Sequence, residues 1–375
     1  MRIGILTHFH KSTNYGGVLQ AYALCKCLND RGHSAEQILY KHSVTKIDSA
    51  RMTGKTFFEK TKKRIKKIIY RRKNREIRRR MEMSFSDFRE SVPHTCREYT
   101  SDTIEQVVSD FDLYITGSDQ VWNPIWHDPA YLLQFVGNSA PKISYAASLG
   151  VSVLDQQQEK IFRTYLTDFD GISVREKTAA DLLSPLTNKE VNVCVDPTLL
   201  LSVDDWDAVA SERVVDEKYV FLYLLGDDMR VRKLAESFAD FHGMKLVMIP
   251  DLLGAYRKND RKICADFIPN ATPRDFISLI KHSEYVLTDS FHTCVFSLLY
   301  KKEFFAFSRG GLIKMGSRIG DLLTMFECSS RFCVGGDRCN LDYLLSCKPI
   351  DYKKEFHSFN KEKQESLDYL LNYLN

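Results

Sequence analysis

The chain has 375 residues, more than one hydrophobic core usually supports, so we expect two domains. Its 44% hydrophobic content is ample for globular cores, and its formal net charge of +4 is mild. No apolar run reaches the roughly 20 residues of a membrane-spanning helix, and residues 1–6 enter a strand in place of a signal peptide. The ten cysteines show neither a disulfide framework nor zinc-site spacing. We therefore expect a reduced, cytoplasmic protein, either soluble or attached to a membrane surface.

The first predicted unit is a strand, a helix and a second strand within residues 3–40, with a glycine pair in its first loop. Gly16 and Gly17 would let the backbone approach a ligand closely, and Asn14 and Gln20 would offer amides to it. The three-glycine spacing of a dinucleotide site is missing, and so is a phosphate-binding P-loop. The alternative is that the glycines only pack the helix on the sheet.

Residues 55–90 differ in kind, because they form a basic stretch in which apolar residues recur at roughly helical spacing. The basic side chains between Lys62 and Arg80 suit an anionic membrane surface or a polyanion. No nucleic-acid recognition motif accompanies them, so we expect no nucleic-acid partner. Phe85 and Phe88 are expected to dock the end of this helix on the protein. The alternative is a solvated helical insertion without a membrane partner.

The strand predicted over residues 111–116 runs into a loop rich in hydrogen-bonding side chains. Asp119, Gln120, Trp122 and Asn123 lie together there. Loops that combine acids, amides and an aromatic ring are typical of sugar or other substrate sites. We therefore assign this loop to ligand binding.

The strand predicted over residues 171–174 delivers positive charge at its carboxyl end. Arg175 and Lys177 follow it and would hold a phosphate or a carboxylate. The alternative is that Arg175 pairs with a neighbouring acid, either Glu176 or Asp196.

The second half of the chain repeats the alternation of strands and helices. Strands are predicted at residues 219–225, 245–249 and 304–307, and helices at 229–241 and 272–280.

The most informative stretch of this half is residues 284–299. A short apolar strand precedes Asp289 and Ser290, which have helix-capping chemistry, and a helix follows. His292 lies in the first turn of that helix, beside free backbone N–H groups and the positive end of the helix dipole. An anion held there would lie against an imidazole that exchanges a proton near neutral pH. The alternative is a histidine packed under a loop.

Two such halves predict an α/β protein with two facing Rossmann-like domains, the glycosyltransferase-B arrangement, and a basic helical insertion in the first domain. We place the N-terminal domain at residues 1–197, with the insertion at about 55–90, and the C-terminal domain at 198–352. Residues 353–375 are expected to form a final helix that packs back on the first domain.

Six sequence blocks, in order, resemble the polysaccharide pyruvyl transferase family as far as about residue 335. They are Asn14-Tyr-Gly-Gly-Val-Leu-Gln-Ala-Tyr-Ala-Leu24, Thr116-Gly-Ser-Asp-Gln-Val-Trp-Asn123, Ser144-Tyr-Ala-Ala-Ser-Leu-Gly150, Ser173-Val-Arg-Glu176, Val195-Asp-Pro-Thr198 and Thr288-Asp-Ser-Phe-His292. The resemblance implies a glycosyltransferase-B-like fold and transfer of pyruvate from phosphoenolpyruvate to a sugar, usually as a ketal. This chemistry demands no metal ion or cofactor.

The resemblance also implies roles for individual residues. His292 matches the family's functional histidine, and Arg175 falls in the Ser-x-Arg-Glu block. Many members carry arginine where this chain has Ser290, so other cations must help to bind the donor phosphate. The predicted donor-binding residues are Arg175, Ser290, Lys302, Arg309 and Arg318. His292 is the expected proton donor, and Asp119 the expected base on the acceptor side.

For the acceptor we expect a sugar, with galactose suggested by the family, on a polyprenyl-diphosphate-linked oligosaccharide at the inner membrane face. The predicted acceptor-binding residues are Asn14, Gly16, Gly17, Gln20, Gln120, Trp122 and Asn123. Two alternatives stay open: a nucleotide-sugar-dependent glycosyltransferase of the same fold, and a non-enzymatic protein that binds a membrane or a polyanion.

Overall fold

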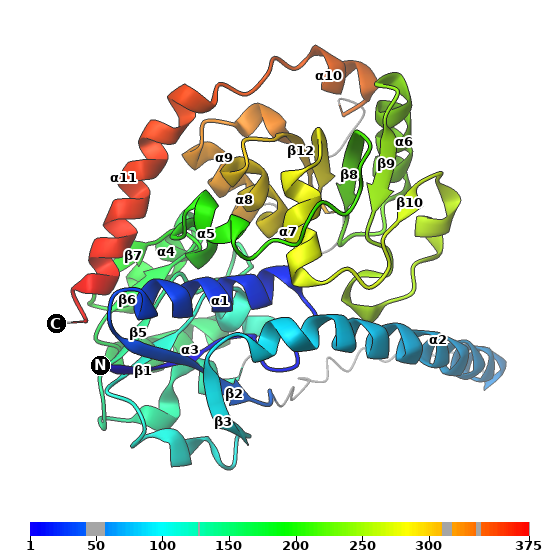
Figure 1. Cartoon of the computed structure of the whole chain (residues 1–375). Helices are drawn as coiled ribbons and strands as arrows, with labels where there is room; N and C mark the ends of the chain where they lie inside the picture. Colours follow the sequence, from blue (N-terminus) through cyan, green and yellow to red (C-terminus); the bar gives the residue numbers. More distant parts are fainter. Residues whose placement is uncertain (43–56, 127, 310–316, 335–338, 375) are drawn as a thin grey trace.

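The computed structural model describes residues 1–42, 57–126, 128–309, 317–334 and 339–374 (Figure 1). For residues 57–71, 73, 126, 317 and 354–358 it describes the backbone alone. The chain forms two parallel sheets with helices packed around them, which confirms the predicted α/β class.

The first sheet has the strand order β3-β2-β1-β4-β5, with every pair parallel. Its strands are β1 (Arg2–Leu6), β2 (Ser34–Tyr40), β3 (His94–Tyr99), β4 (Leu113–Thr116) and β5 (Lys142–Ser144). A parallel pair, β6 (Ile172–Val174) and β7 (Val191–Val193), joins this sheet through isolated bridges. The helices of this half are α1 (Tyr15–Asn29), α2 (Phe57–Glu90), α3 (Gln156–Tyr165) and α4 (Lys177–Leu183). β4 is buried at every position, as expected for a parallel strand covered on both faces.

The second sheet has the order β10-β9-β8-β11-β12-β13, again parallel throughout. Its strands are β8 (Tyr219–Tyr223), β9 (Lys245–Met248), β10 (Asp266–Phe267), β11 (Tyr285–Thr288), β12 (Glu303–Phe307) and β13 (Phe332–Cys333). The helices of this half are α5 (Val203–Asp207), α6 (Met229–Phe241), α7 (Pro273–Lys281), α8 (Phe291–Leu299), α9 (Ser317–Met325) and α10 (Leu341–Ser346). Short 3₁₀ turns complete the connections in both halves.

The two halves share one hydrophobic core in which α1 packs against α7 and α8. Tyr15, the first residue of α1, stacks on Phe276 of α7 with ring centroids 4.7 Å apart, and its hydroxyl donates to the Ala271 carbonyl oxygen. Trp206 and Phe296 meet edge to face in the same core. These contacts bring the start of α1 close to the start of α8.

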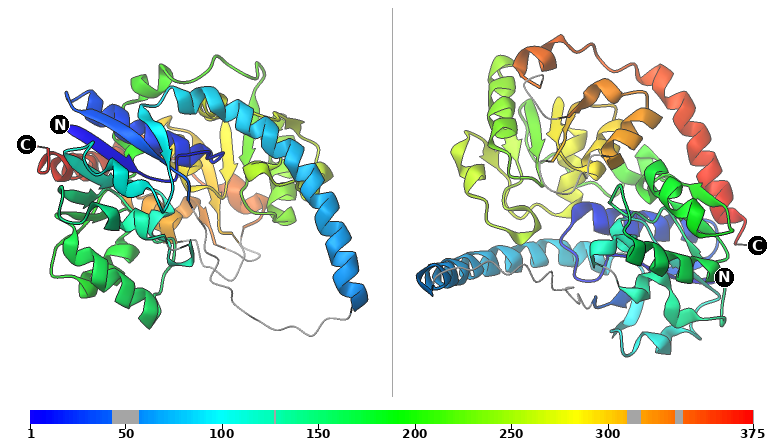
Figure 2. Two further views of the ribbon diagram at one scale, coloured as in Figure 1. Left: turned by 90° about the horizontal axis from the view of Figure 1, so that it is seen from below. Right: turned by 180° about the vertical axis from the view of Figure 1, so that it is seen from behind.

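Two long helices, α2 and α11 (Tyr352–Leu371), lie at the outside of the fold (Figure 1). The amino-terminal part of α2 projects away from it (Figures 1 and 2), whereas its other end is anchored by the buried Phe85 and Phe88, as predicted. α11 runs from the second half back to the first (Figure 1), where the Tyr369 hydroxyl donates to the Ser144 carbonyl oxygen. Among the described residues, no helix is both long and apolar enough to cross a bilayer.

Candidate active site

His292 is fixed at the junction of the two halves by α8 and α1. The Ser290 side chain caps α8 by accepting from the Thr293 N–H, so His292 lies in the first helical turn and is only 7% exposed. A Cβ atom added to Gly16, at the start of α1, would lie 1.9 Å from Nδ1 of this imidazole. Residue 16 must therefore lack a side chain for the two helices to approach.

Asp196 joins both halves at this point, and one of its oxygens carries most of the contacts. Oδ2 accepts hydrogen bonds from Arg175 Nη1 at 2.8 Å and from the Ser118 hydroxyl at 3.0 Å. His292 Nε2 lies 3.4 Å from the same oxygen. Although burial opposes ionisation, the neighbouring His292 and Arg175 hold the pKa of Asp196 well below its usual value. Arg175 and His292, both assigned to the site from the sequence, thus contact the same carboxylate.

Arg175 is 5% exposed and surrounded by acids and an aromatic ring. Its Nε donates to Glu176, and its guanidinium lies over the Phe291 ring at 4.2 Å from the centroid. The alternative interpretation, a pairing with Glu176 or Asp196, is therefore correct for two of its nitrogens. The third, Nη2, has no hydrogen-bond partner and lies 3.9 Å from Asp119.

Asp119 has a strained backbone, with φ 71° and ψ −174° in a residue other than glycine. Its backbone is held in place because its carbonyl oxygen accepts from the N–H groups of Val121 and Ser148. Burial opposes ionisation, but Arg175 and His292 lower the pKa of the Asp119 carboxyl overall. Strain of this kind accumulates at functional sites, and here it aims a carboxylate at the Arg175–His292 cluster.

Arg318, from α9, completes the cluster and is 5% exposed. Burial, and secondly the neighbouring Arg175, lower the pKa of Arg318 to about 10, so it stays charged at neutral pH. Among the described residues no carboxylate forms an ion pair with it, and its Nε has no partner. Turning the Gln120 carboxamide places that oxygen 3.0 Å from Arg318 Nη1.

A cavity of about 290 Å³ adjoins these residues and is lined by both halves of the chain. Arg175, Lys177 and Asp196 line it from the first half, and Phe291 and Arg318 from the second. Most of the remaining wall is apolar. Small-molecule sites commonly combine such a wall with a few converging polar groups.

Another polar cluster, which contains His8 and His42, lies near the end of β1. Neither histidine is among the site residues predicted from the sequence. His8 packs edge to face on Tyr131, with ring centroids 4.9 Å apart, and His42 Nδ1 lies 2.8 Å from Asp128 Oδ2. Burial lowers the pKa of His8 despite the opposing influence of Asp119. The signal for His8 is its position just after the first strand, at the point where the strand order of the first sheet reverses.

The other predicted donor residues lie at different distances from this cluster. Lys302 lies apart from the cluster, because it precedes β12 at the amino edge of the sheet and its Nζ donates to the Ser283 carbonyl oxygen. This position does not favour its predicted role in donor binding. Arg309 follows β12 at the carboxyl edge of the sheet, and its Nε lies 4.0 Å from Asp289 Oδ2. The Ser290 hydroxyl is occupied by its helix cap.

The predicted acceptor residues divide in the same way. Gln20 is fully buried, and its amide donates to the Thr7 hydroxyl and to the Gly17 carbonyl oxygen. Trp122 is also buried, and its indole donates to the Tyr131 carbonyl oxygen. The donors of both side chains are thus satisfied inside the first half, whereas the Gln20 carboxamide oxygen is buried without a hydrogen-bond partner.

Three predicted residues lie nearer the cluster. Asn123 Nδ2 donates to the Gln120 carboxamide oxygen, and turning the Gln120 carboxamide would direct that oxygen at Arg318 instead. Asn14 is partly exposed and directly precedes α1. Within the described part of the chain, no group of three or more His, Cys, Asp or Glu side chains is arranged to hold a metal ion.

Comparison with known proteins gives a family and a fold. The family model described as polysaccharide pyruvyl transferase matches residues 14–311, and no curated protein sequence matches. UDP-GlcNAc 2-epimerase from Neisseria meningitidis, solved with UDP-GlcNAc, is similar in structure with a TM-score of 0.54 at 9% identity, over 99% of this chain and 100% of that one.

Two further solved structures agree on the fold. The Methanocaldococcus jannaschii UDP-GlcNAc 2-epimerase gives a TM-score of 0.53 at 13% identity, with all of both chains covered. S. aureus MnaA, solved with UDP, gives 0.52 at 14% identity, over 100% of this chain and 97% of that one. These likenesses confirm the predicted glycosyltransferase-B-like arrangement of two Rossmann-like domains.

Proposed function

The chain belongs to the polysaccharide pyruvyl transferase family, and from that premise we propose that it transfers the pyruvyl group of phosphoenolpyruvate to a sugar as a ketal. One observation supports the donor most directly. Arg175 Nη2 and Arg318 Nε are buried and have no hydrogen-bond partner, and the buried His292 Nε2, although 3.4 Å from Asp196 Oδ2, makes no well-formed hydrogen bond. Buried polar groups are normally satisfied, so three such nitrogens in one cluster indicate a ligand that accepts several hydrogen bonds.

Phosphoenolpyruvate has the chemistry that this cluster requires. It carries a phosphate and a carboxylate, each of which accepts charge-assisted hydrogen bonds from guanidinium groups. Arg318 takes the place of the cation that this chain lacks at Ser290, because it is buried and not neutralised by an ion pair among the described residues. The apolar wall of the adjoining cavity suits the methylene group of the donor.

The proposed reaction begins with a proton transfer from His292 to the methylene carbon of phosphoenolpyruvate. The resulting cationic C2 bonds to the oxygen of one sugar hydroxyl, whose proton passes to the Asp119 carboxylate. The bond from C2 to the phosphate oxygen then breaks, and inorganic phosphate leaves with a proton. A second sugar hydroxyl adds to C2 and loses its own proton, which closes the ketal. Substrate and product atoms balance without a metal ion or a redox cofactor.

The test is a phosphate-release assay with phosphoenolpyruvate and a panel of sugar acceptors. The proposal expects inorganic phosphate together with a sugar product that has gained a pyruvate ketal, as identified by mass spectrometry. Release of a nucleoside diphosphate from a nucleotide sugar would instead support a glycosyltransferase. Turnover of neither substrate class on any acceptor would contradict both enzymatic functions.

We further propose that the acceptor is the galactose of a lipid-linked oligosaccharide, and that α2 docks the enzyme on an anionic membrane. The projecting part of α2 is rich in basic residues, among them Lys62, Lys63, Arg64, Lys66 and Lys67, whose side chains lie outside the described residues. Each basic residue near such a surface contributes about 1 kcal/mol at low salt.

Replacing these five residues with Gln should weaken binding to vesicles that contain phosphatidylserine, as measured by sedimentation. It should also slow turnover of a lipid-linked acceptor, whereas turnover of a soluble sugar stays at the wild-type rate. If vesicle binding survives the substitutions, α2 is a structural projection and the membrane proposal fails.

A further inference from the structure

A second cavity, of about 360 Å³, lies wholly in the second half of the chain. It opens among the loop after β8, the first turns of α6 and the ends of β11 and β12. β8 and β11 are adjacent strands at which the order of the sheet reverses. Ligand crevices of open α/β sheets form outside the carboxyl ends of strands at such a point. None of the residues that act in the proposed reaction lines this cavity.

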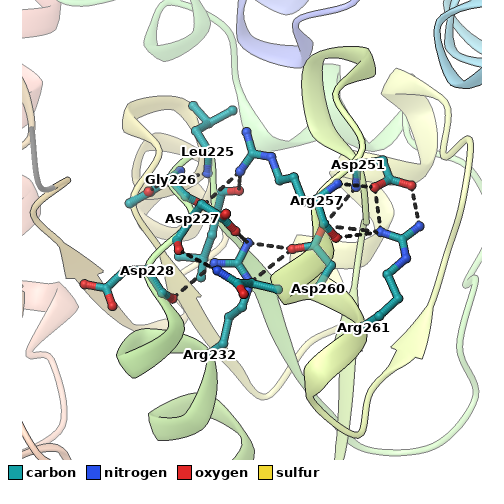
Figure 3. Close-up of polar contacts among 12 residues, drawn as sticks. Leu225, Gly226, Asp227, Asp228, Arg232, Asp251, Arg257, Asp260 and Arg261 are labelled. Carbon is teal, nitrogen blue, oxygen red and sulfur yellow. Dashed lines mark hydrogen bonds and ion pairs between the residues drawn. The ribbon is translucent and has the colours of Figure 1, made fainter. Parts of the chain in front are cut away.

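The wall formed by residues 224–228 is held rigidly from two sides. Figure 3 shows Arg257 and Arg232 reaching this loop, where Arg257 donates to the carbonyl oxygens of Leu224 and Gly226, and Arg232 to those of Gly226 and Asp228. From the opposite side, the Asp289 carboxylate accepts from the N–H groups of Leu225 and Gly226, at 2.6 and 2.7 Å. Arg232 is itself fully buried and paired with Asp260. The cavity is therefore formed before any ligand binds.

The charges that line the cavity disfavour a phosphate. Among the described residues that line it, Asp227, Asp228 and Asp289 face a single cation, Arg309. The N-terminus of α6, where a phosphate would otherwise be stabilised, is capped by the Asp228 side chain, which accepts from the Arg230 N–H.

The remaining lining suits a sugar. Val231 and Phe307 supply apolar surface for the C–H face of a sugar ring. Carboxylates accept hydrogen bonds from hydroxyls, and a guanidinium donates to them. A neutral polyhydroxylated ring matches this lining better than a nucleotide does.

The cavity also adjoins the proposed donor site. Arg309 lies 4.0 Å from Asp289 and is close enough to Arg318 to lower the pKa of that residue. Asp289 is followed by Ser290 and by Phe291, the ring on which Arg175 lies. A ring bound in the cavity would thus have hydroxyls directed toward the donor.

We propose that this second cavity is the binding site for a neutral hexose ring of the acceptor. The inference rests on the proposed pyruvyl transfer and names the place of its acceptor. On this proposal, the main acceptor contacts are made by residues 224–231, Asp289, Phe307 and Arg309, and not by the loops of the first half.

The test uses the full chain and saturation-transfer NMR with millimolar methyl glycosides of galactose, glucose and mannose, in the presence of phosphoenolpyruvate. Val231→Trp fills the cavity without changing its charge, and Lys233→Trp is the matched control, because Lys233 is exposed on the same helix. At least one glycoside should bind the wild type and the control, and binding should weaken at least tenfold in Val231→Trp. If Val231→Trp does not fold, Asp227→Ala is used in its place, since Asp227 is largely exposed.

Three results would overturn the proposal: no glycoside binds, binding is unaffected by filling the cavity, or uridine diphosphate displaces the glycoside. Phosphoenolpyruvate binding is measured in parallel by calorimetry and should be equal in all three proteins. If phosphoenolpyruvate does not bind the wild type, the proposed donor is wrong. The glycoside measurement tests only the assignment of the second cavity to the acceptor.

Discussion

At the residue scale, Asp196 is the group on which the candidate site depends. It is buried, and it accepts from Arg175, Ser118 and Thr198 while lying beside His292. Removing one partner of a buried ion pair is strongly destabilising, because the remaining charge stays buried without compensation. Asp196 therefore positions Arg175 and His292, and its loss should affect stability as well as the proposed turnover.

We predict that Asp196→Asn lowers the free energy of unfolding by about 3 kcal/mol at pH 7. The folded-state pKa of Asp196 lies below its unfolded value of about 4, so its contribution is present above that pH and is lost as the pH falls below it. The difference between wild type and Asp196→Asn in urea denaturation should accordingly shrink below about pH 4. A difference that is independent of pH would show that the carboxylate charge is not what stabilises the site.

A second prediction at this scale tests whether Arg318, unlike Lys302, contributes to donor binding. Arg318→Gln should raise the KM for phosphoenolpyruvate about tenfold or more, because a charge-assisted hydrogen bond contributes roughly 1.5–3 kcal/mol. Lys302→Gln is the control, since Lys302 lies at the opposite edge of the sheet. Steady-state kinetics at saturating acceptor decide the question. Equal effects of the two substitutions would remove Arg318 from the donor site.

At the element scale, the site depends on the close approach of α1 and α8. Gly16 lies directly against the His292 imidazole, whereas Gly17 lies near the His8 carbonyl oxygen. Gly16 therefore has a packing role, because its lack of a side chain lets α1 approach His292 of α8, whereas the predicted approach of this backbone to a ligand stays a prediction. A methyl group at residue 16 must displace either the ring or the helix.

We predict that Gly16→Ala lowers kcat by about 10²-fold, as expected when a general acid is misplaced, while the protein stays folded. Gly243→Ala is the matched control: it lies after α6 with φ +62° and no atom near its added Cβ, so it strains the backbone by about 1–2 kcal/mol without touching the site. Circular dichroism and kcat are measured for both variants. Wild-type turnover in Gly16→Ala would return His292 to a packing role.

At the scale of the whole molecule, the cavity of about 290 Å³ proposed for the donor exists only because both halves of the chain and α11 enclose it. Arg175 and Asp196 come from the first half, Phe291 and Arg318 from the second, and Glu362 from the returning helix. A ligand held by both halves binds the folded assembly and not the separated parts. Its binding free energy then adds to the stability of the complete fold.

Phosphoenolpyruvate should therefore raise the midpoint of thermal unfolding, and at 100 times its Kd the added stability should be about 2.7 kcal/mol. Lys302→Gln should show the same increase as the wild type, and Arg318→Gln a smaller one at the same concentration. Scanning calorimetry at several donor concentrations makes the measurement. An unchanged midpoint in the wild type would contradict binding at the junction of the two halves.

The sequence alone was enough for the α/β class, the two sets of strands, the long basic helix and the position of His292 in a first helical turn. These features follow from local periodicity, capping residues and ordered motifs, all of which lie within short stretches of the chain. Arg175 was found in the same way, since it directly follows a strand.

The tertiary structure decided the features that depend on contacts between distant segments of the chain. It placed Asp196 between Arg175 and His292, distinguished Arg318 from Lys302, and turned Gln20 and Trp122 inward. The order of the strands determines which edges of the two sheets face each other, and no local sequence pattern predicts that order.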